Sequence, residues 1–265
     1  MNIKDFMGDE SEKPLDKIPQ NGGFCGIFRT IGCIGDSLSS GEFESTDENG
    51  NKGYHDYFEY SWGQYIAREA GCRVYNFSRG GMTAREFCDG FASANDYWSP
   101  EKRCQAYIIA MGVNDITENG INLGSIDDID KENYDNNKKT FIGNYAKMIQ
   151  KMKKNQPKAK FFLMTIPQTG KSDRTEAEDL HQRLMYELAE YFDNTYVLDF
   201  RKYAPVYDDE FKKNFYLGGH LNPCGYMLTA KMVMSYIDYI IRHNMEDFKN
   251  VGFIGKDFHN ATAKW

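Results

Sequence analysis

The chain has 265 residues, a net charge of −7 and 41% hydrophobic residues, enough apolar material for the core of one large α/β domain. The acidic balance and the lack of a long Lys/Arg run exclude a nucleic-acid footprint and argue against an anionic membrane surface. The sequence shows neither a bilayer-spanning stretch nor a signal-peptide core, so it predicts a cytoplasmic protein with no membrane partner.

The pattern along the chain predicts one domain over residues 24–244, between two end segments. Residues 1–23 are polar and end in Asn-Gly-Gly, which is typical of an extended or partly disordered lead-in. Residues 245–265 are rich in apolar side chains, and we expect this tail to dock on the domain or on a second copy in a homo-oligomer. The six cysteines show no CxxC spacing, which predicts buried free thiols, no metal site and no cofactor.

Short apolar runs alternate along this domain with longer segments of helical periodicity. The runs are apolar on both faces, which is typical of parallel strands covered on both sides. We expect strands at 27–34, 73–77, 106–111, 160–165 and 196–199, and helices at 56–70, 83–93, 138–154, 175–192 and 224–243. This order predicts an α/β fold, a three-layer α/β/α sandwich around a five-stranded parallel sheet.

Two segments need a separate interpretation. Residues 115–137 form a polar connection after the third strand, and loops this long are usually functional or mobile. The aromatic residues at 54–62 could stack on sugar rings, but the spacing of Tyr54, Tyr57, Phe58 and Trp62 favours one buried face of a helix.

A parallel sheet binds its ligands at the carboxyl ends of its strands. In this chain, polar side chains follow several of the predicted strands at that end. Gly-Asp-Ser-Leu at 35–38 can expose the hydroxyl and N–H of Ser37 on a tight turn, which we expect Asp36 to brace. The paired glycines in 76–83 let the N–H of Gly81 approach a ligand. Gly-Val-Asn-Asp at 112–115 adds the Asn114 amide, and His220 lies in a glycine-rich loop before the last helix.

These residue types form a reacting set. Ser37 would attack an ester carbonyl and His220 would accept its proton, while the N–H groups of Ser37 and Gly81 and the Asn114 amide would form the oxyanion hole. Each such donor supplies about 3–4 kcal/mol of transition-state stabilisation in comparable sites. The other four histidines lack partners at ligand spacing, and we expect them on the surface: His55, His181, His243 and His259.

The four sequence blocks resemble those of the SGNH (GDSL-type) hydrolases in order and in strand position. The resemblance covers residues 27–243 and implies a flavodoxin-like α/β/α fold and metal-free serine chemistry. The family's Ser, Gly, Asn and His fall on Ser37, Gly81, Asn114 and His220. Its members are esterases, lipases, thioesterases and carbohydrate O-deacetylases.

The sequence departs from this family at one position. Members carry an Asp three residues before the His, and Leu217 stands there in this chain. Replacing a triad acid can cost ~10⁴-fold in turnover where the wrong histidine tautomer results. Either a backbone carbonyl of the 215–219 loop or a carboxylate from elsewhere would have to orient His220, and loss of activity is a third alternative. The carboxylate candidates are Glu42, Glu44, Asp208 and Asp209.

Together the residues and the resemblance predict a serine esterase that removes a small acyl group, above all acetyl, from a carbohydrate or a similar small polar molecule. The polar 115–137 segment and the lack of an apolar lid sequence favour such a substrate. The alternatives are a lysophospholipase or thioesterase, and a non-catalytic carbohydrate-binding member of the fold.

Overall fold

A computed structural model describes residue 3 and residues 6–117, 122–171 and 173–255. A parallel sheet of five strands, in the order β4-β1-β5-β6-β7, runs through its centre. These strands are β1 (Thr30–Gly35), β4 (Arg73–Ser78), β5 (Ala106–Ala110), β6 (Lys160–Met164) and β7 (Thr195–Leu198). The predicted α/β class and the five-stranded parallel sheet are therefore confirmed.

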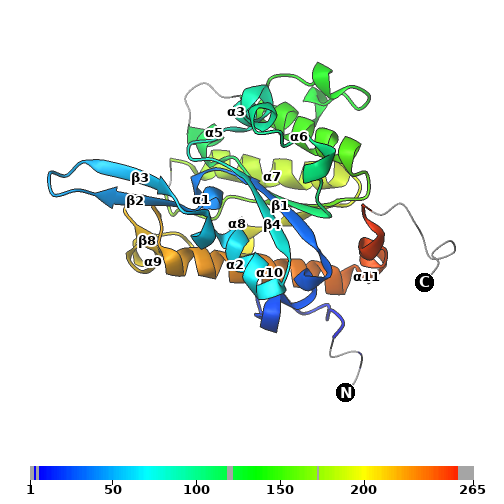
Figure 1. Ribbon diagram of the computed structural model, residues 1–265, viewed down its shortest axis with the longest axis horizontal. Helices are drawn as coiled ribbons and strands as arrows, with labels where there is room; N and C mark the ends of the chain where they lie inside the picture. The colour runs from blue at the N-terminus through cyan, green and yellow to red at the C-terminus, as the bar shows by residue number, and fades with distance from the viewer. Residues whose placement is uncertain (1–2, 4–5, 118–121, 172, 256–265) are drawn as a thin grey trace.

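Helices cover both faces of this sheet (Figure 1). On one face lie α2 (Trp62–Ala70) and α10 (Pro223–His243), and on the other α6 (Phe141–Asn155) and α7 (Thr175–Tyr191). Successive side chains of a strand point to opposite faces, so Ile108 of β5 joins the first core and Ile109 joins the second. The sheet is buried on both sides, as its apolar runs predict.

The remaining elements are short. They include α1 (Ser37–Ser40), α3 (Ala84–Glu86), a π-helical turn (Phe87–Phe91), α4 (Ala92–Ala94), α5 (Val113–Thr117), α8 (Phe200–Tyr203), α9 (Asp209–Phe215), α11 (Met245–Phe248), and the two-residue strands β8 (Tyr216–Leu217) and β9 (His220–Leu221). The 3₁₀ turns are Gln20–Ile27, Phe58–Tyr60, Pro100–Lys102, Ile126–Asp128, Tyr134–Asn136 and Val251–Phe253. The polar 115–137 connection thus contains the end of α5 and two 3₁₀ turns, while residues 118–121 lie outside the described residues.

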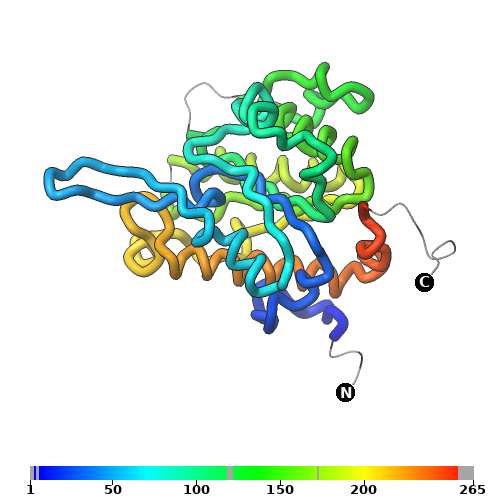
Figure 2. The backbone as a smooth tube through the Cα atoms, viewed as in Figure 1, coloured from blue at the N-terminus to red at the C-terminus, as the bar shows by residue number. Residues whose placement is uncertain are grey.

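An antiparallel hairpin, which the sequence pattern did not reveal, follows the first strand. It consists of β2 (Glu42–Thr46) and β3 (Lys52–Asp56), and it projects from the body as a long arm (Figure 2). The predicted helix at 56–70 therefore begins only at Trp62. The interpretation of 54–62 as one buried helical face is wrong, because Tyr54 and Tyr57 are 55% and 49% exposed whereas Trp62 is buried.

The two end segments both contact the domain. Arg242 of α10 donates from its two terminal nitrogens to the two carboxylate oxygens of Glu12, each at 2.7 Å. Near the C-terminus Phe248, Val251 and Ile254 are buried in the core beside α10. The predicted domain boundaries stay a prediction, and Phe258, His259 and Trp265 lie outside the described residues. Within the described part of the chain, none of the helices is long and apolar enough to cross a membrane.

Candidate active site

Three neighbouring strands bring the first three sequence blocks to one edge of the sheet. β1 lies between β4 and β5, and Gly35 at its end is in register with Ser78 of β4 and Ala110 of β5. Ser37, Gly81 and Asn114 follow these three strand ends. Because parallel strands share one carboxyl edge, the sheet places these three loops side by side.

The turn that carries Ser37 is fixed from two sides. The side chain of Asp36 accepts a hydrogen bond from the Leu38 N–H at 3.0 Å, as expected for a residue that braces the turn. Burial raises the pKa of this Asp36 carboxyl to about 7. From α10, the hydroxyl of Tyr226 donates to the carbonyl of Ser37 at 3.3 Å and to that of Glu42 at 2.6 Å. Tyr226 therefore ties the turn to the start of β2.

The two expected oxyanion donors outside this turn are also held in place. Gly81 has a φ of +67°, a left-handed conformation that favours glycine. The Asn114 Nδ2 donates to the Met82 carbonyl at 3.0 Å. A side-chain amide carries two N–H groups, so this bond leaves one for a ligand.

His181 was expected on the surface, and that expectation is wrong. Its ring is fully buried under the loop that carries Asn114, and its Nε2 donates to the Met111 carbonyl at 2.9 Å. Burial lowers the pKa of His181 to about 4, so the ring stays neutral. An isolated histidine on a helix gives no sequence signal for such a contact.

His220 belongs to β9, which lies against α1. Its ring is mostly buried and lies between two carboxylates of β2. The Nε2 atom is 3.0 Å from Glu42 Oε1, and the Nδ1 atom is 3.8 Å from Glu44 Oε2. Within the described residues no hydrogen bond joins His220 to Ser37, and the buried Nδ1 atom has no hydrogen-bond partner.

The two carboxylates differ in their surroundings. The Lys52 ammonium lies 2.7 Å from Glu44 Oε1, and the Gly219 N–H donates to Glu44 Oε2 at 2.8 Å. These contacts hold the pKa of Glu44 below its ordinary value, the lysine first and the backbone N–H second. Burial raises the pKa of Glu42, against the opposing effect of His220. Glu42 also lies so close to Gly80 that a Cβ there would collide with its Oε2.

The other candidates for orienting His220 lie elsewhere or make other contacts. Asp208 caps α9 by accepting from the Phe211 N–H at 2.9 Å, and Asp209 is exposed on the same helix. Leu217, at the family's acid position, is 51% exposed. None of the carbonyls of the 215–219 loop, all within the described residues, forms a hydrogen bond with Nδ1.

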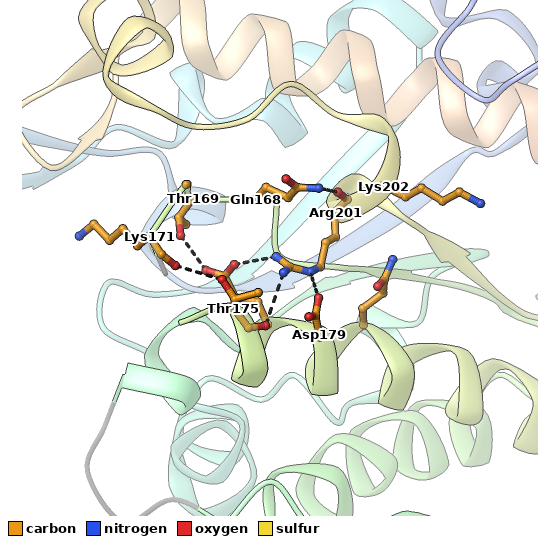
Figure 3. A pocket seen from close by; sticks show the side chains of 10 residues that line it. Gln168, Thr169, Lys171, Thr175, Asp179, Arg201 and Lys202 are labelled. Atoms are coloured by element: carbon orange, nitrogen blue, oxygen red, sulfur yellow. Dashed lines mark hydrogen bonds and ion pairs between the residues drawn. The ribbon is translucent and has the colours of Figure 1, made fainter. Parts of the chain in front are cut away.

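A hollow of about 490 Å³ opens farther along the same edge of the sheet, beyond β6 and β7 (Figure 3). Arg201 lies at its wall and donates to Glu178 at 2.6 Å and to Asp179 at 2.7 Å. These ion pairs neutralise the guanidinium, and the lining includes neither Ser37 nor His220. The hollow is therefore separate from the candidate site.

Comparison with known proteins identifies one family. A family model described as the GDSL-like lipase/acylhydrolase family matches residues 33–228. A search of curated proteins found no match.

Solved structures with the same fold include three carbohydrate-active esterases. A carbohydrate esterase family 2 enzyme from Corynascus thermopiles (Myceliophthora fergusii) has a TM-score of 0.55 and 14% identity, over 79% of this chain and 65% of that one. A family two carbohydrate esterase from Clostridium thermocellum, in complex with cellohexaose, has a TM-score of 0.56 and 14% identity, over 80% and 64%. An acetyl xylan esterase has a TM-score of 0.51 and 18% identity, over 78% and 99%. The chain thus spans about two thirds of the two family 2 enzymes.

Proposed function

The chain belongs to the GDSL-like lipase/acylhydrolase family, and on that premise we propose that it removes a short acyl group, above all acetyl, from a carbohydrate or a similarly polar ester. Family membership makes it a serine hydrolase that acts on ester bonds. The observation that carries the proposal is the meeting of the Ser37, Gly81 and Asn114 loops on three neighbouring strand ends, with His220 on the strand against α1.

The proposed reaction proceeds through an acyl-enzyme. The Ser37 hydroxyl attacks the ester carbonyl carbon, and its proton passes to His220 Nε2. The oxyanion that forms receives hydrogen bonds from the Ser37 and Gly81 N–H groups and from the Asn114 amide. The alcohol leaves with the proton from His220, and a water molecule, activated by the same ring, then releases the acyl group as a carboxylic acid.

This reaction sets a condition on Glu42. A neutral imidazole carries one proton, so His220 can accept another at Nε2 only if its own proton is on Nδ1. The Glu42 oxygen must also release its contact with Nε2 so that the Ser37 hydroxyl can approach.

Two features support a short acyl group and a polar alcohol. Glu42 lies against Gly80, beside the proposed oxyanion donors, and so limits the space there. The exposed ring of Tyr54 lies on β3 and meets the His220 ring edge-on at a centroid distance of 5.8 Å, and the exposed ring of Tyr57, directly after β3, stacks on His55. Flat amphipathic rings suit sugar surfaces. The names of the similar solved structures, carbohydrate esterases and an acetyl xylan esterase, point the same way.

Turnover of p-nitrophenyl acetate, butyrate and octanoate tests the acyl length, and acetate release from acetylated xylo-oligosaccharides tests the alcohol. We expect the acetate ester to be the best of the three. Preference for octanoate, or hydrolysis of a lysophospholipid or an acyl-thioester at a higher rate, would favour those alternatives. Sugar binding by a protein whose Ser37 does not react with a fluorophosphonate would favour a non-catalytic binding function.

A further inference from the structure

The hairpin places two carboxylates on one face of β2. Glu42 and Glu44 are separated by one residue, and alternate side chains of a strand share a face. Phe43 between them points the other way, and its ring packs on Tyr226 at a centroid distance of 5.5 Å. Because the Tyr226 hydroxyl also binds the Glu42 carbonyl, the register of β2 against α10 is fixed at this point.

The Glu44 side chain packs against the loop that carries His220. This side chain is only 5% exposed, and the Gly219 N–H donates to its Oε2. Gly218 has a φ of +64°, and a Cβ at that position would come within 2.6 Å of the Glu44 carboxyl carbon. The two glycines before His220 therefore let the loop close over a carboxylate that enters from another part of the chain.

The Glu44 carboxylate lies slightly too far from His220 Nδ1 for a hydrogen bond. The distance from Nδ1 to Glu44 Oε2 is 3.8 Å, and shortening by roughly one ångström would bring it into the normal range. Nδ1 is a buried polar atom that lacks a hydrogen-bond partner in the described part of the chain. Buried polar atoms of this kind nearly always have one.

Each ring nitrogen of His220 faces a carboxylate. The ionisable groups that face the ring or its carboxylates include Glu42 and Glu44 from β2, and Lys52, Tyr54 and Asp56 from β3. Lys52 and the Gly219 N–H keep Glu44 ionised, so it is a strong acceptor for an Nδ1–H. Glu42 faces the other nitrogen, Nε2, at 3.0 Å and competes with Glu44 for the ring proton.

We propose that Glu44 is the positioning residue that holds His220 with its proton on Nδ1, in place of the acid that is missing at Leu217. This inference rests on the proposed esterase function, in which Nε2 must accept the Ser37 proton. The third member of the set therefore comes from the hairpin that follows the nucleophile, and Lys52 and the Gly219 N–H fix its position.

Two substitutions of Glu44 test the proposal by steady-state kinetics on p-nitrophenyl acetate. Glu44→Gln should lower kcat by about 10²- to 10⁴-fold and leave KM nearly unchanged, because Glu44 does not touch the substrate. Glu44→Asp, which restores a carboxylate, should recover at least part of this loss. Glu48→Gln, an exposed change near the hairpin tip, is the matched control and should behave as the wild type.

The tautomer gives a readout that does not depend on activity. In protein labelled with ¹⁵N-histidine, the His220 ring signals, assigned with a His220→Asn variant, should show a protonated Nδ1 in the wild type. In Glu44→Gln the proton should shift towards Nε2. A purely structural role for Glu44 would change the unfolding midpoint without this shift. If Glu44→Gln does not fold, Lys52→Met should produce the same shift and a loss in kcat of about three- to tenfold.

Several outcomes would overturn the proposal. One is a Glu44→Gln variant that keeps most of the wild-type kcat and the wild-type ring signals. Another is a collapse of kcat in Glu42→Gln while Glu44→Gln is unaffected, since Glu42 would then be the residue that holds the ring. A wild type that hydrolyses none of the esters and resists a fluorophosphonate contradicts the proposed function instead, and the ring signals still decide the role of Glu44.

Discussion

His220 Nε2 lies 3.0 Å from Oε1 of Glu42, a carboxylate that enters the site directly after the turn of Ser37. The nitrogen that the proposed reaction uses as its base therefore faces an acidic side chain of the same protein. Glu42 is mostly buried, and its backbone carbonyl is held by Tyr226. Glu42 and Glu44, both on β2, therefore compete for the ring proton of His220: Glu42 favours it on Nε2, and Glu44 favours it on Nδ1.

Replacing Glu42 by Gln should raise kcat/KM for p-nitrophenyl acetate at neutral pH. The substitution removes the charge that favours a proton on Nε2, and a hydrogen bond to a charged acceptor exceeds one to a neutral acceptor by about 1 kcal/mol. We therefore expect an increase of up to about tenfold. A fall of a hundredfold or more would instead show that the carboxylate of Glu42 is needed for turnover.

Replacing Asn114 by Ala should lower kcat by about 10²- to 10³-fold while KM changes little, as for the loss of one oxyanion donor. The variant also loses the bond to the Met82 carbonyl, which should cost about 1 kcal/mol of unfolding free energy. Kinetics and urea unfolding separate the two effects. Asn250→Ala, the same change at an exposed position in another part of the chain, is the control, and equal activity of the two variants would contradict the role of Asn114.

Asp36 should make stability fall as pH rises. Burial raises its pKa to about 7 from an ordinary 3.8, so the folded state holds this proton at pH values where the unfolded chain has lost it. Between those two pKa values the folded state binds more protons, and the unfolding free energy decreases with increasing pH.

Asp36→Asn keeps an oxygen for the Leu38 N–H and removes this titration. Relative to that variant, the unfolding free energy of the wild type should fall by about 2–3 kcal/mol between about pH 5 and about pH 8. Urea unfolding of both proteins across this range is the measurement. Parallel curves for the two proteins would mean that Asp36 titrates at its ordinary pKa.

The sheet and the convergence of three loops could be predicted because they depend on local patterns. The strands that precede Ser37, Gly81 and Asn114 are apolar on both faces, and parallel pairing puts their carboxyl ends together. The hairpin could not be predicted in the same way, because its two strands are short and mostly polar and contain a single buried residue, Glu44. Only the Asp-Glu-Asn-Gly turn at 47–50 signalled a change of chain direction.

The sequence could not single out Glu44 as the carboxylate that approaches the His220 loop, for a different reason. This approach joins segments at opposite ends of the chain, and the sequence offered four carboxylates and a backbone carbonyl as equal alternatives. Distances in the folded chain reduce these to Glu42 and Glu44, because Asp208 caps α9 and Asp209 points into solvent on the same helix. The burial of His181 was missed likewise, since its partner is a carbonyl after β5.

The most direct test of the proposed function is the identity of the residue that reacts with a fluorophosphonate probe. After reaction, digestion and mass spectrometry, we expect the added mass on Ser37, loss of ester turnover in proportion to labelling, and neither labelling nor turnover in Ser37→Ala. Ser45→Ala, an exposed change on β2, should react as the wild type does. Labelling of another residue, or a Ser37→Ala variant that keeps most of the wild-type turnover, would contradict the assignment of Ser37 as the nucleophile.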